Sequence, residues 1–336
     1  MPKPKVAFYW CASCGGCEEA IIDLNEDLLT VAGAVDIIFW PCAMDFKYSD
    51  VHALADKEID ICFINGAIQT SEHLEMAELL RRKSKILISF GACSQLGGIP
   101  GLANFWNREA IFRSSYLDKC PSVDNPDGVV PQTSSQVPEG ELTLPAFHNT
   151  VKSTDQVVDI DYYLPGCSPA PHLTLAAVMA LLGGEVPPKG TVLAPNKALC
   201  DTCPRADTKP EKLMLEDVKR ISLHAADPEK CLLAQGFICM GPVTRTGCSA
   251  DGEGRCIAAN MPCRGCYGPP SEVKDVGAKM ISALASIVGL ENEETMSEAD
   301  VQKLMNTAVD PAGLFYRFSL AKSMLRRKQP DTQTKE

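Results

Sequence analysis

The chain has 336 residues, a net charge of −11 and 45% hydrophobic residues. This length can bury a sizeable core and favours two domains, whereas the acidic balance argues against nucleic acid as a main partner. The 16 cysteines are far more than packing requires, and in a cytoplasmic protein they indicate bound metal rather than a disulfide scaffold.

The start of the chain and its apolar runs bear on location. Residues 1–5 pass directly into a strand pattern, without a hydrophobic signal region or an Arg-Arg pair. The longest apolar runs, such as 173–182, are too short to cross a bilayer. We therefore expect a cytoplasmic protein without a membrane span, in which thiols stay reduced.

The first apolar run, Val6–Trp10, leads into the sequence CASCGGCEE, after which apolar residues recur at helical spacing. This motif is expected at the carboxyl end of the first strand, where doubly wound sheets bind their ligands. The thiols of Cys14 and Cys17 stand there in place of a phosphate loop, and thiolates suit zinc or iron–sulfur clusters. Glu18 and Glu19 follow, where the helix dipole favours acids; a role in proton transfer is the alternative.

Residues 1–187 alternate strand and helix patterns. The expected strands are Val6–Trp10, Asp36–Trp40, Ile59–Asn65, Lys85–Phe90 and Val157–Tyr163. The expected helices are Glu18–Thr30, Asp50–Asp56, Ser71–Lys83 and His172–Leu182. This alternation predicts an α/β domain, flavodoxin-like in outline, with a doubly wound parallel sheet and helices on both faces.

Two later strands also end in cysteines. One runs into Gly91, Ala92 and Cys93, and another runs into the sequence LPGCSP, which contains Cys167. Taken singly, each is more simply a buried structural cysteine. Because the carboxyl ends of parallel strands share one edge, both thiols can converge with Cys14 and Cys17, and four thiolates complete the ligand set of a 4Fe–4S cluster.

Between these two strands, residues 97–153 are rich in Pro, Asn, Gly and Ser and show little periodicity. This pattern predicts a long insertion packed over the domain. Loops of this length are usually functional or covered by a partner.

A loop-rich segment follows, which we place at 188–270. It contains eight cysteines: Cys200, Cys203, Cys231, Cys239, Cys248, Cys256, Cys263 and Cys266. Such a segment needs metal or cross-links to become ordered. Eight cysteines make two sets of four, which fit two clusters or, as the alternative, two zinc sites.

The remaining residues, 271–336, form a third part with helical patterns at Ser271–Val288, Ser297–Thr307 and Pro311–Arg326. The last pattern is amphipathic and could dock on a partner or on its own fold. The polar tail Gln329–Glu336 is expected to be disordered.

Four motifs together identify a family: CGGCEE, GAC, PGCSP and the closing PCRGC. With these motifs the chain resembles the small, electron-transferring subunit of NiFe hydrogenases along nearly its whole length to about residue 270. It is most similar to the cytoplasmic, methyl-viologen-reducing type that is associated with heterodisulfide reductase. The resemblance implies an oxidoreductase subunit that conducts electrons from H2 oxidation at a partner.

The resemblance also implies three 4Fe–4S clusters and assigns their ligands. The cluster nearest the NiFe centre would use Cys14, Cys17, Cys93 and Cys167. The far cluster would use Cys200, Cys203, Cys231 and Cys239, with Cys200 standing where many relatives have histidine. The middle cluster would use Cys248, Cys256, Cys263 and Cys266. Many respiratory relatives have a proline in place of a fourth ligand, which gives a 3Fe–4S cluster. Cys256 stands close to that place in this sequence, so a 4Fe–4S cluster is implied, and the added thiolate favours a lower potential.

The implied partners follow from the same resemblance. A large subunit that bears the NiFe site would cover the face around Cys14 and Cys167. A 2Fe–2S adapter subunit, leading to a heterodisulfide-reductase-like flavin subunit, would meet the face around Cys200 and Cys239. The chain itself would carry neither a NiFe site nor a catalytic acid or base.

Three alternatives remain open from the sequence. The chain could be a zinc-stapled binding module, the cluster-bearing subunit of respiratory complex I, or part of a related complex without a NiFe site. Cys11 could replace Cys14 as a ligand, Cys62 is expected to be a packing residue, and Cys42 and Cys120 receive no role.

Overall fold

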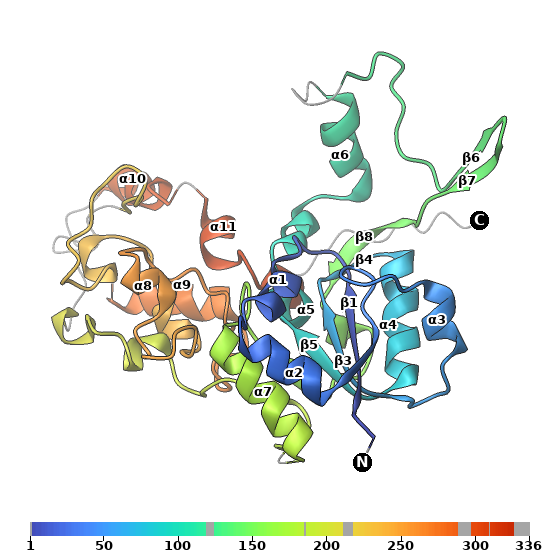
Figure 1. Ribbon diagram of the computed structural model, residues 1–336. Coiled ribbons are helices and arrows are strands. Elements are labelled where there is room, and N and C mark those ends of the chain that lie inside the picture. The colour runs from blue at the N-terminus through green and yellow to red at the C-terminus, as the bar shows by residue number, and fades with distance from the viewer. Residues whose placement is uncertain are drawn as a thin grey trace.

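The computed structural model describes residues 2–118, 124–184, 186–210, 218–287, 297–308 and 310–325. Figure 1 shows a sheet with helices on both faces and, beside it, a loop-rich lobe that carries α8 to α10. An insertion with α6, β6 and β7 projects away from the sheet. The predicted α/β class with a parallel sheet is confirmed.

The central sheet has six strands in the order β10-β9-β5-β3-β1-β2, and every neighbouring pair is parallel. The strands are β1 (Lys5–Trp10), β2 (Asp36–Phe39), β3 (Ile59–Asn65), β5 (Ser84–Phe90), β9 (Tyr162–Leu164) and β10 (Thr191–Val192). The chain passes from β1 outward to β2 and then crosses back to β3. The order therefore reverses at β1 and β3, and the loop after β1 lies at this switch point.

Helices cover both faces of the sheet (Figure 1). On one face lie α1 (Gly16–Ile22), α2 (Asp27–Ala34) and α7 (Pro171–Gly183), and on the other lie α3 (Tyr48–Ala53) and α4 (Ser71–Lys83). The alternation of side chains along β1 divides the core accordingly. Val6 and Phe8 pack with the first set of helices, whereas Ala7 and Tyr9 pack with the second.

The prediction of one helix over Glu18–Thr30 is wrong, because two helices occupy this segment with a break between them. Asn25 lies in the break with a φ of 53° and donates a hydrogen bond to the Asp23 carbonyl at 3.0 Å. Asparagine tolerates this left-handed conformation better than most residues, and the conformation ends a regular helix.

The expected strand Val157–Tyr163 is largely wrong, since β9 includes only its last two residues. The chain forms a 3-10 turn, η3 (Thr154–Gln156), and the amides of Val157 and Val158 both donate to the Thr154 carbonyl. These amides are committed to the turn and cannot join the sheet.

The insertion is more regular than its composition predicts. It contains η1 (Pro100–Phe105), α6 (Arg108–Phe112), the π-helical turn η2 (Arg113–Leu117), and the hairpin β6 (Ser134–Val137) with β7 (Gly140–Thr143). Its last strand, β8 (Phe147–Lys152), pairs antiparallel with β4 (Ile68–Thr70). The buried amide of Asn104 anchors the insertion, because it donates to the Val151 carbonyl at 2.9 Å and accepts from the Val151 amide at 2.7 Å.

The loop-rich lobe is built from short turns and a few helices. Its elements are η4 (Leu199–Asp201), η5 (Ala206–Thr208), η6 (Leu233–Gln235), η7 (Gly241–Val243), α8 (Arg255–Ala258), α9 (Val276–Ile287) and α10 (Glu298–Asn306). Residues of α9 share one core cluster with Leu199, Phe237 and Ile257. The division into 1–187, 188–270 and 271–336 remains a prediction.

The prediction of one helix over Pro311–Arg326 is wrong. Helix α11 (Pro311–Phe315) ends early, and the chain continues to the short turn η9 (Leu320–Lys322). Phe315 and Tyr316 pack into the loop-rich lobe, whereas Phe318 packs on α5 (Ala92–Leu96) of the sheet lobe. Burial on two different sides is incompatible with one apolar helical stripe. The segment docks on its own fold, and Gln329–Glu336 lies outside the described residues.

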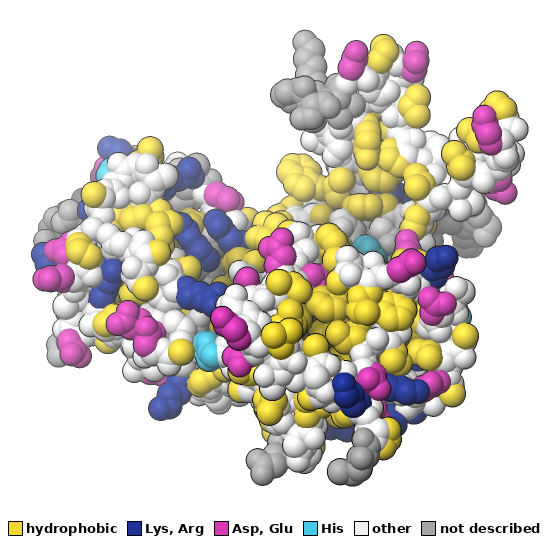
Figure 2. Space-filling model, in the orientation of Figure 1, with side chains coloured by type: hydrophobic (Ala, Val, Ile, Leu, Met, Phe, Trp, Pro, Cys, Tyr) yellow, Lys and Arg dark blue, Asp and Glu magenta, His cyan; other side chains and the backbone are white. Residues whose placement is uncertain are grey.

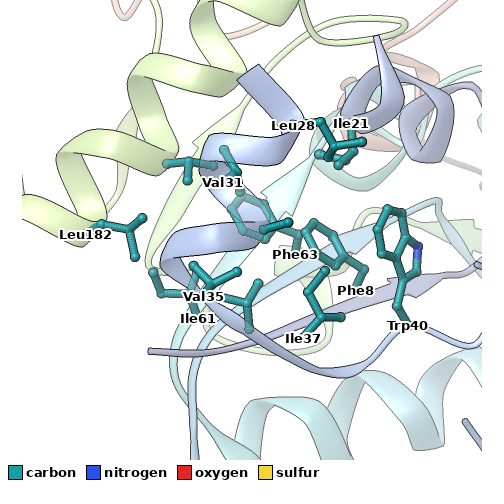
Figure 3. Close-up of a pocket in the computed structure, with 13 residues that line it drawn as sticks. Phe8, Ile21, Leu28, Val31, Val35, Ile37, Trp40, Ile61, Phe63 and Leu182 are labelled. Atoms are coloured by element: carbon teal, nitrogen blue, oxygen red, sulfur yellow. The ribbon is translucent and has the colours of Figure 1, made fainter. Parts of the chain in front are cut away.

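A cavity lies between the sheet, α2 and α7, and it is far too small for a cofactor such as a flavin. It is entirely apolar and has a volume of about 20 Å³ (Figure 3). Phe8, Phe63, Trp40 and Val31 converge on it. This is room for about one water, and an apolar lining offers that water no hydrogen-bond partners, so the cavity is a packing defect rather than a ligand site. No helix in the described ranges is long and apolar enough to cross a membrane.

We expect a buried carboxylate, Asp161, to make the sheet lobe sensitive to acid. Burial raises its pKa, but hydrogen bonds from Arg81 at 2.7 Å, from Lys189 and from the Leu87 amide at 2.9 Å outweigh burial and lower it. A lowered pKa contributes stability above the unfolded value of about 3.9, and this contribution is lost as the pH falls through the folded pKa. Asp161→Asn should lower the free energy of unfolding by roughly 2–4 kcal/mol at pH 7 and by much less near pH 3. Urea unfolding of both proteins across this range measures the difference, and an equal cost at both pH values would contradict the assignment.

Candidate metal centre

The CASCGGC loop is held in place by the end of β3. The Cys11 amide donates to the Asn65 carbonyl at 2.8 Å, and Ala12 forms a two-bond bridge with Ala67. Gly15 then takes a φ of 85° as the residue before α1. The loop therefore turns sharply into the helix, with Cys14 exposed and Cys17 buried.

The four cysteines at the strand ends are neighbours, as their mutual effects on pKa show. Burial and the proximity of Cys93, Cys167 and Cys14 raise the pKa of the Cys17 thiol. Burial, Cys167 and Cys14 raise the pKa of Cys93 to about 12. The loops that carry Cys93 and Cys167 are tied together, since Gly91 donates to the Leu164 carbonyl at 2.8 Å. We call these four residues the first cysteine group.

Two glycines leave room for the sulfur atoms of this group. A Cβ on Gly91 would lie 2.4 Å from the Sγ of Cys17, and a Cβ on Gly98 would lie 2.4 Å from the Sγ of Cys93. Both glycines have positive φ, of 88° and 56°. Four thiols, two of them packed against backbone that lacks a Cβ, have the donor chemistry of an iron–sulfur cluster site.

The second cysteine group comprises Cys248, Cys256, Cys263 and Cys266. The pKa of Cys266 is raised to about 12 by burial, with contributions from Cys256 and Cys248. Cys263 is buried, and its pKa is raised by burial and by the proximity of Cys239 and Cys266. Cys256 is positioned by α8, whereas Cys263 and Cys266 flank a turn in which Gly265 has a φ of 92°.

The third cysteine group comprises Cys200, Cys203, Cys231 and Cys239. Gly241 fits between two of its sulfurs, because a Cβ there would lie 3.1 Å from the Sγ of Cys200 and 3.6 Å from that of Cys239. Burial and Cys239 raise the pKa of Cys200 to about 12, with further contributions from Cys203 and Cys231. All four thiols therefore face one region.

The three groups are connected in series. Cys167 of the first group lies beside Cys266 of the second: its backbone lowers the pKa of the Cys266 thiol, whereas its own thiol raises that pKa. The amide of Cys263 in the second group donates to the Sγ of Cys239 in the third at 3.3 Å. The second group therefore contacts both the first and the third.

Two of the cysteines without a predicted ligand role, Cys11 and Cys62, are separate from these groups. Cys11 and Cys62 are buried together in the core on the α4 face of the sheet, and burial is the main cause of their raised pKa values. This placement separates Cys11 from the first group, whereas Cys14 belongs to it. Cys42 is exposed, and Cys120 lies outside the described residues.

Three residues beside the first group form a buried polar network. Glu18 is 5% exposed and accepts hydrogen bonds from the Trp40 indole and the Asn65 amide. Burial raises the pKa of Glu18, and the two hydrogen bonds oppose this shift. Asn65 also accepts a hydrogen bond from Ser13 at 3.0 Å. Glu18 therefore anchors the cysteine loop to β3, whereas Glu19 is exposed and merely occupies the first helical turn.

The glycines and the cations that lie near the thiols were not predicted from the sequence. Lys209 lowers the pKa of Cys200, and Arg264 lowers that of Cys256, in both cases against the larger opposing effect of burial. Positive charge beside a thiol favours the thiolate that binds metal. Arg264 lies inside the Cys-Arg-Gly-Cys sequence, so its proximity to the ligands was visible in the motif. Among the residues that the structure describes, no three Cys, His, Asp or Glu side chains are arranged to hold a single metal ion.

Comparisons with known proteins relate the chain to hydrogenases. A family model described as NADH ubiquinone oxidoreductase, 20 Kd subunit, matches residues 14–181. The chain is 38% identical to the iron-sulfur subunit of the F420-non-reducing hydrogenase of Archaeoglobus profundus, over 96% of this chain and 98% of that one. It is 37% identical to a subunit of the F420-non-reducing hydrogenase of Methanothermobacter marburgensis, over 97% of each chain.

A solved structure agrees with the fold. The [NiFeSe] hydrogenase from Desulfovibrio vulgaris Hildenborough matches with a TM-score of 0.52 and 15% identity, over 81% of this chain and 95% of that one. This likeness concerns the fold alone. The two relatives, by contrast, match along nearly their whole length, so the match includes the cysteine-rich region 188–270.

Proposed function

The chain belongs to the family of hydrogenase small subunits that includes these two F420-non-reducing hydrogenase subunits, and from this premise we propose that it conducts electrons for a NiFe hydrogenase. It is a subunit of an oxidoreductase and is homologous to the small subunit rather than to the large one that bears nickel. The observation that best supports conduction is the series of three cysteine groups, linked through Cys167 with Cys266 and through Cys263 with Cys239.

We propose that each group holds one 4Fe–4S cluster. The donor count supports this, since each group offers four thiols and no histidine. Cys14, Cys17, Cys93 and Cys167 would hold the first cluster. Cys248, Cys256, Cys263 and Cys266 would hold the second. Cys200, Cys203, Cys231 and Cys239 would hold the third. A cluster of this kind, when bound, supplies one-electron redox chemistry at a potential set by charge, hydrogen bonds and exposure.

The side chains and backbone around the thiols have three tasks in this proposal. Apolar packing keeps water from Cys17, Cys239 and Cys263, each of which is less than 9% exposed. Lys209 and Arg264 place positive charge near the thiolates. The amide of Cys263 donates to the Sγ of Cys239 and so connects the ligand shells of the second and third groups. No residue of this chain is assigned an acid or base step.

The NiFe-bearing large subunit is proposed to cover the face that carries Cys14 and Cys167. Near this face Trp10 and Ile99 remain 40% and 47% exposed. The insertion adds further exposed apolar side chains, among them Trp106, Leu142 and Leu144. Figure 2 shows hydrophobic side chains over the base of this projecting arm. Apolar surface on such a scale is typical of an interface with another subunit.

The next electron carrier is proposed to meet the third group. Lys209 is exposed in this part of the loop-rich lobe and would suit an acidic partner, whereas Lys230 is paired with Asp227 at 3.2 Å. The resemblance favours a 2Fe–2S adapter subunit, followed by a heterodisulfide-reductase-like flavin subunit. Flavin content and iron in excess of that of this chain, measured on the native complex, would support this arrangement, and their absence would contradict it.

The first test is metal and acid-labile sulfide analysis of the native complex, purified without oxygen, together with H2-dependent viologen reduction. We expect about twelve irons and twelve sulfides per copy of this chain and nickel in a larger co-purifying subunit. Cross-linking of the same complex should join the large subunit to residues 99–118 or 124–144.

Two other outcomes would change the conclusion. Zinc without sulfide would replace the electron carrier with a metal-stapled binding module. Iron and sulfide without nickel or H2-dependent activity would retain electron transfer but remove the hydrogenase.

A further inference from the structure

The C-terminal segment, residues 311–325, is fixed to the loop-rich lobe at both of its ends. Figure 1 shows its helix α11 between this lobe and the sheet. Phe315 and Tyr316 are 8% and 4% exposed and share a core cluster with α9. A Cβ on Gly277 of α9 would lie 2.3 Å from the Tyr316 ring, so the ring and the helix are in direct contact. Further along, the Met324 amide donates to the Asp275 carboxylate at 2.7 Å.

Between these two attachments the same segment is bound to the sheet lobe. The Phe318 carbonyl accepts from the Gly98 amide at 3.0 Å, and the Ala321 carbonyl accepts from the Gln156 side chain at 3.1 Å. A Cβ on Gly97 would lie 2.3 Å from the Cβ of Ala321, so the two chains touch there. The segment therefore bridges the two lobes, and its place on the sheet lobe is directly beside the loop that follows α5.

Phe318 lies where this bridge meets ligands of two cysteine groups. It is 9% exposed and forms a buried apolar cluster with Ala92 and Leu96 of α5, the helix that carries Cys93 of the first group. Cys266 of the second group is half-buried and packs against the same cluster. The C-terminal segment thus supplies apolar cover at the contact between the first and second groups.

Apolar cover beside a cluster ligand affects the reduction potential. A cluster held by four thiolates is anionic, and reduction adds a further negative charge. Water stabilises the more highly charged reduced form, so a hydrophobic shell that excludes water keeps the potential low. A low potential suits electrons that must be passed on to a low-potential acceptor.

We propose that Phe318 keeps the potential of the second cluster low, because its side chain excludes water from the contact between α5 and Cys266. This inference rests on the proposed function. Phe318 itself neither gains nor loses an electron; it acts through the surroundings of Cys266. The C-terminal segment is then part of the electron path's protein environment, although it contributes no ligand.

Redox titration of the native complex, followed by electron paramagnetic resonance, is the direct test. The signals of the three clusters are distinguished by those that variants of each cysteine group remove. Phe318→Ala should admit water beside Cys266 and shift the potential of the second cluster upward. The third cluster, whose cysteines do not belong to the apolar cluster around Phe318, should keep its potential and serves as the internal reference.

A graded series of variants tests the cause of the shift. The upward shift should grow in the order Phe318→Leu, Phe318→Val, Phe318→Ala, since each step removes more apolar volume, and Phe318→Leu should stay close to the wild type. Val and Leu disturb folding less than Ala does, so the series gives a result even if Phe318→Ala fails to assemble. A second-cluster potential that does not change along the series, or an equal shift of all three clusters, would overturn the proposal.

Phe39→Ala is the matched control for lost stability. Phe39 lies on β2, is fully buried, and belongs to a core cluster that, among the described residues, contains no cysteine of the three groups. It should lower the Tm at least as much as Phe318→Ala does and leave all three potentials unchanged. The same upward shift in Phe39→Ala would show a general loosening of the fold and would overturn the proposal.

Dithionite supplies the electrons in all these titrations, so the result does not depend on a NiFe site. A wild-type complex without 4Fe–4S signals would contradict the proposed function and this inference together. A wild-type complex with these signals, whose second potential is unmoved by the Phe318 variants, would contradict this inference alone.

Discussion

Replacing Cys17 with alanine should remove the first cluster and nearly abolish electron transfer from the large subunit. We expect about four fewer irons per chain and a fall of roughly 100-fold in H2-dependent viologen reduction, because even the loss of an outer-shell partner costs 10–100-fold at metal sites. The iron and sulfide content and the viologen rate are measured on the same anaerobic preparation.

The reason lies in the position of Cys17. It is 6% exposed and has Cys93, Cys167 and Cys14 as neighbours, so no exposed thiol or solvent can take its place. Cys62→Ala is the matched control, because Cys62 is fully buried in β3 but belongs to none of the three groups. It should lower stability while leaving the iron content unchanged. Full iron and activity in Cys17→Ala, or the same loss in Cys62→Ala, would contradict the ligand assignment.

The convergence of the four thiols of the first group can be predicted from the sequence because it depends on the topology of the sheet. Strands that end in cysteine, within an alternation of strands and helices, place their thiols at one edge of a parallel sheet. The long, regular patterns are also predicted closely, and Ser71–Lys83 coincides with α4. The prediction fails at Glu18–Thr30 and Pro311–Arg326, where single residues such as Asn25 or burial on two sides interrupt an apparent helix.

The relative positions of the groups could not be derived from spacing. The link from Cys167 to Cys266 depends on how the two lobes pack, and that packing involves the C-terminal segment through the hydrogen bond from Gly98 to the Phe318 carbonyl at 3.0 Å. The link from Cys263 to Cys239 depends on the irregular turns within the loop-rich lobe. The resemblance to hydrogenase small subunits, rather than the spacing, implies an order for the groups.

The glycines beside the sulfurs were equally hidden. A glycine after a strand is common, and the sequence does not indicate which atoms the Cβ of an alanine would contact at that position. Gly91 is followed by Ala92 and Cys93 along the chain, yet the sulfur closest to its missing Cβ is that of Cys17, which comes from a different strand end. The need for glycine is therefore a property of the assembled site.

Gly91→Ala should damage the first group although it changes no ligand. The new Cβ would lie 2.4 Å from the Sγ of Cys17, and the backbone has a φ of 88°, which alanine adopts at a cost. Strain and displacement together should lower the stability by about 3 kcal/mol and reduce the iron content toward that of Cys17→Ala. Calorimetry and iron analysis measure the two effects.

Gly33→Ala makes the test specific. Gly33 lies on the exposed side of α2 with nothing within 4 Å of its missing Cβ, so alanine there should raise the stability by roughly 0.5–1 kcal/mol and leave the iron content unchanged. If Gly91→Ala retained all its iron, the sulfur of Cys17 would have to move without cost, and the backbone would not define the ligand position. If it lost iron while the polypeptide remained folded, the glycine would be shown to act on the cysteine group itself. The second result is the one that the close approach of Gly91 to Cys17 predicts.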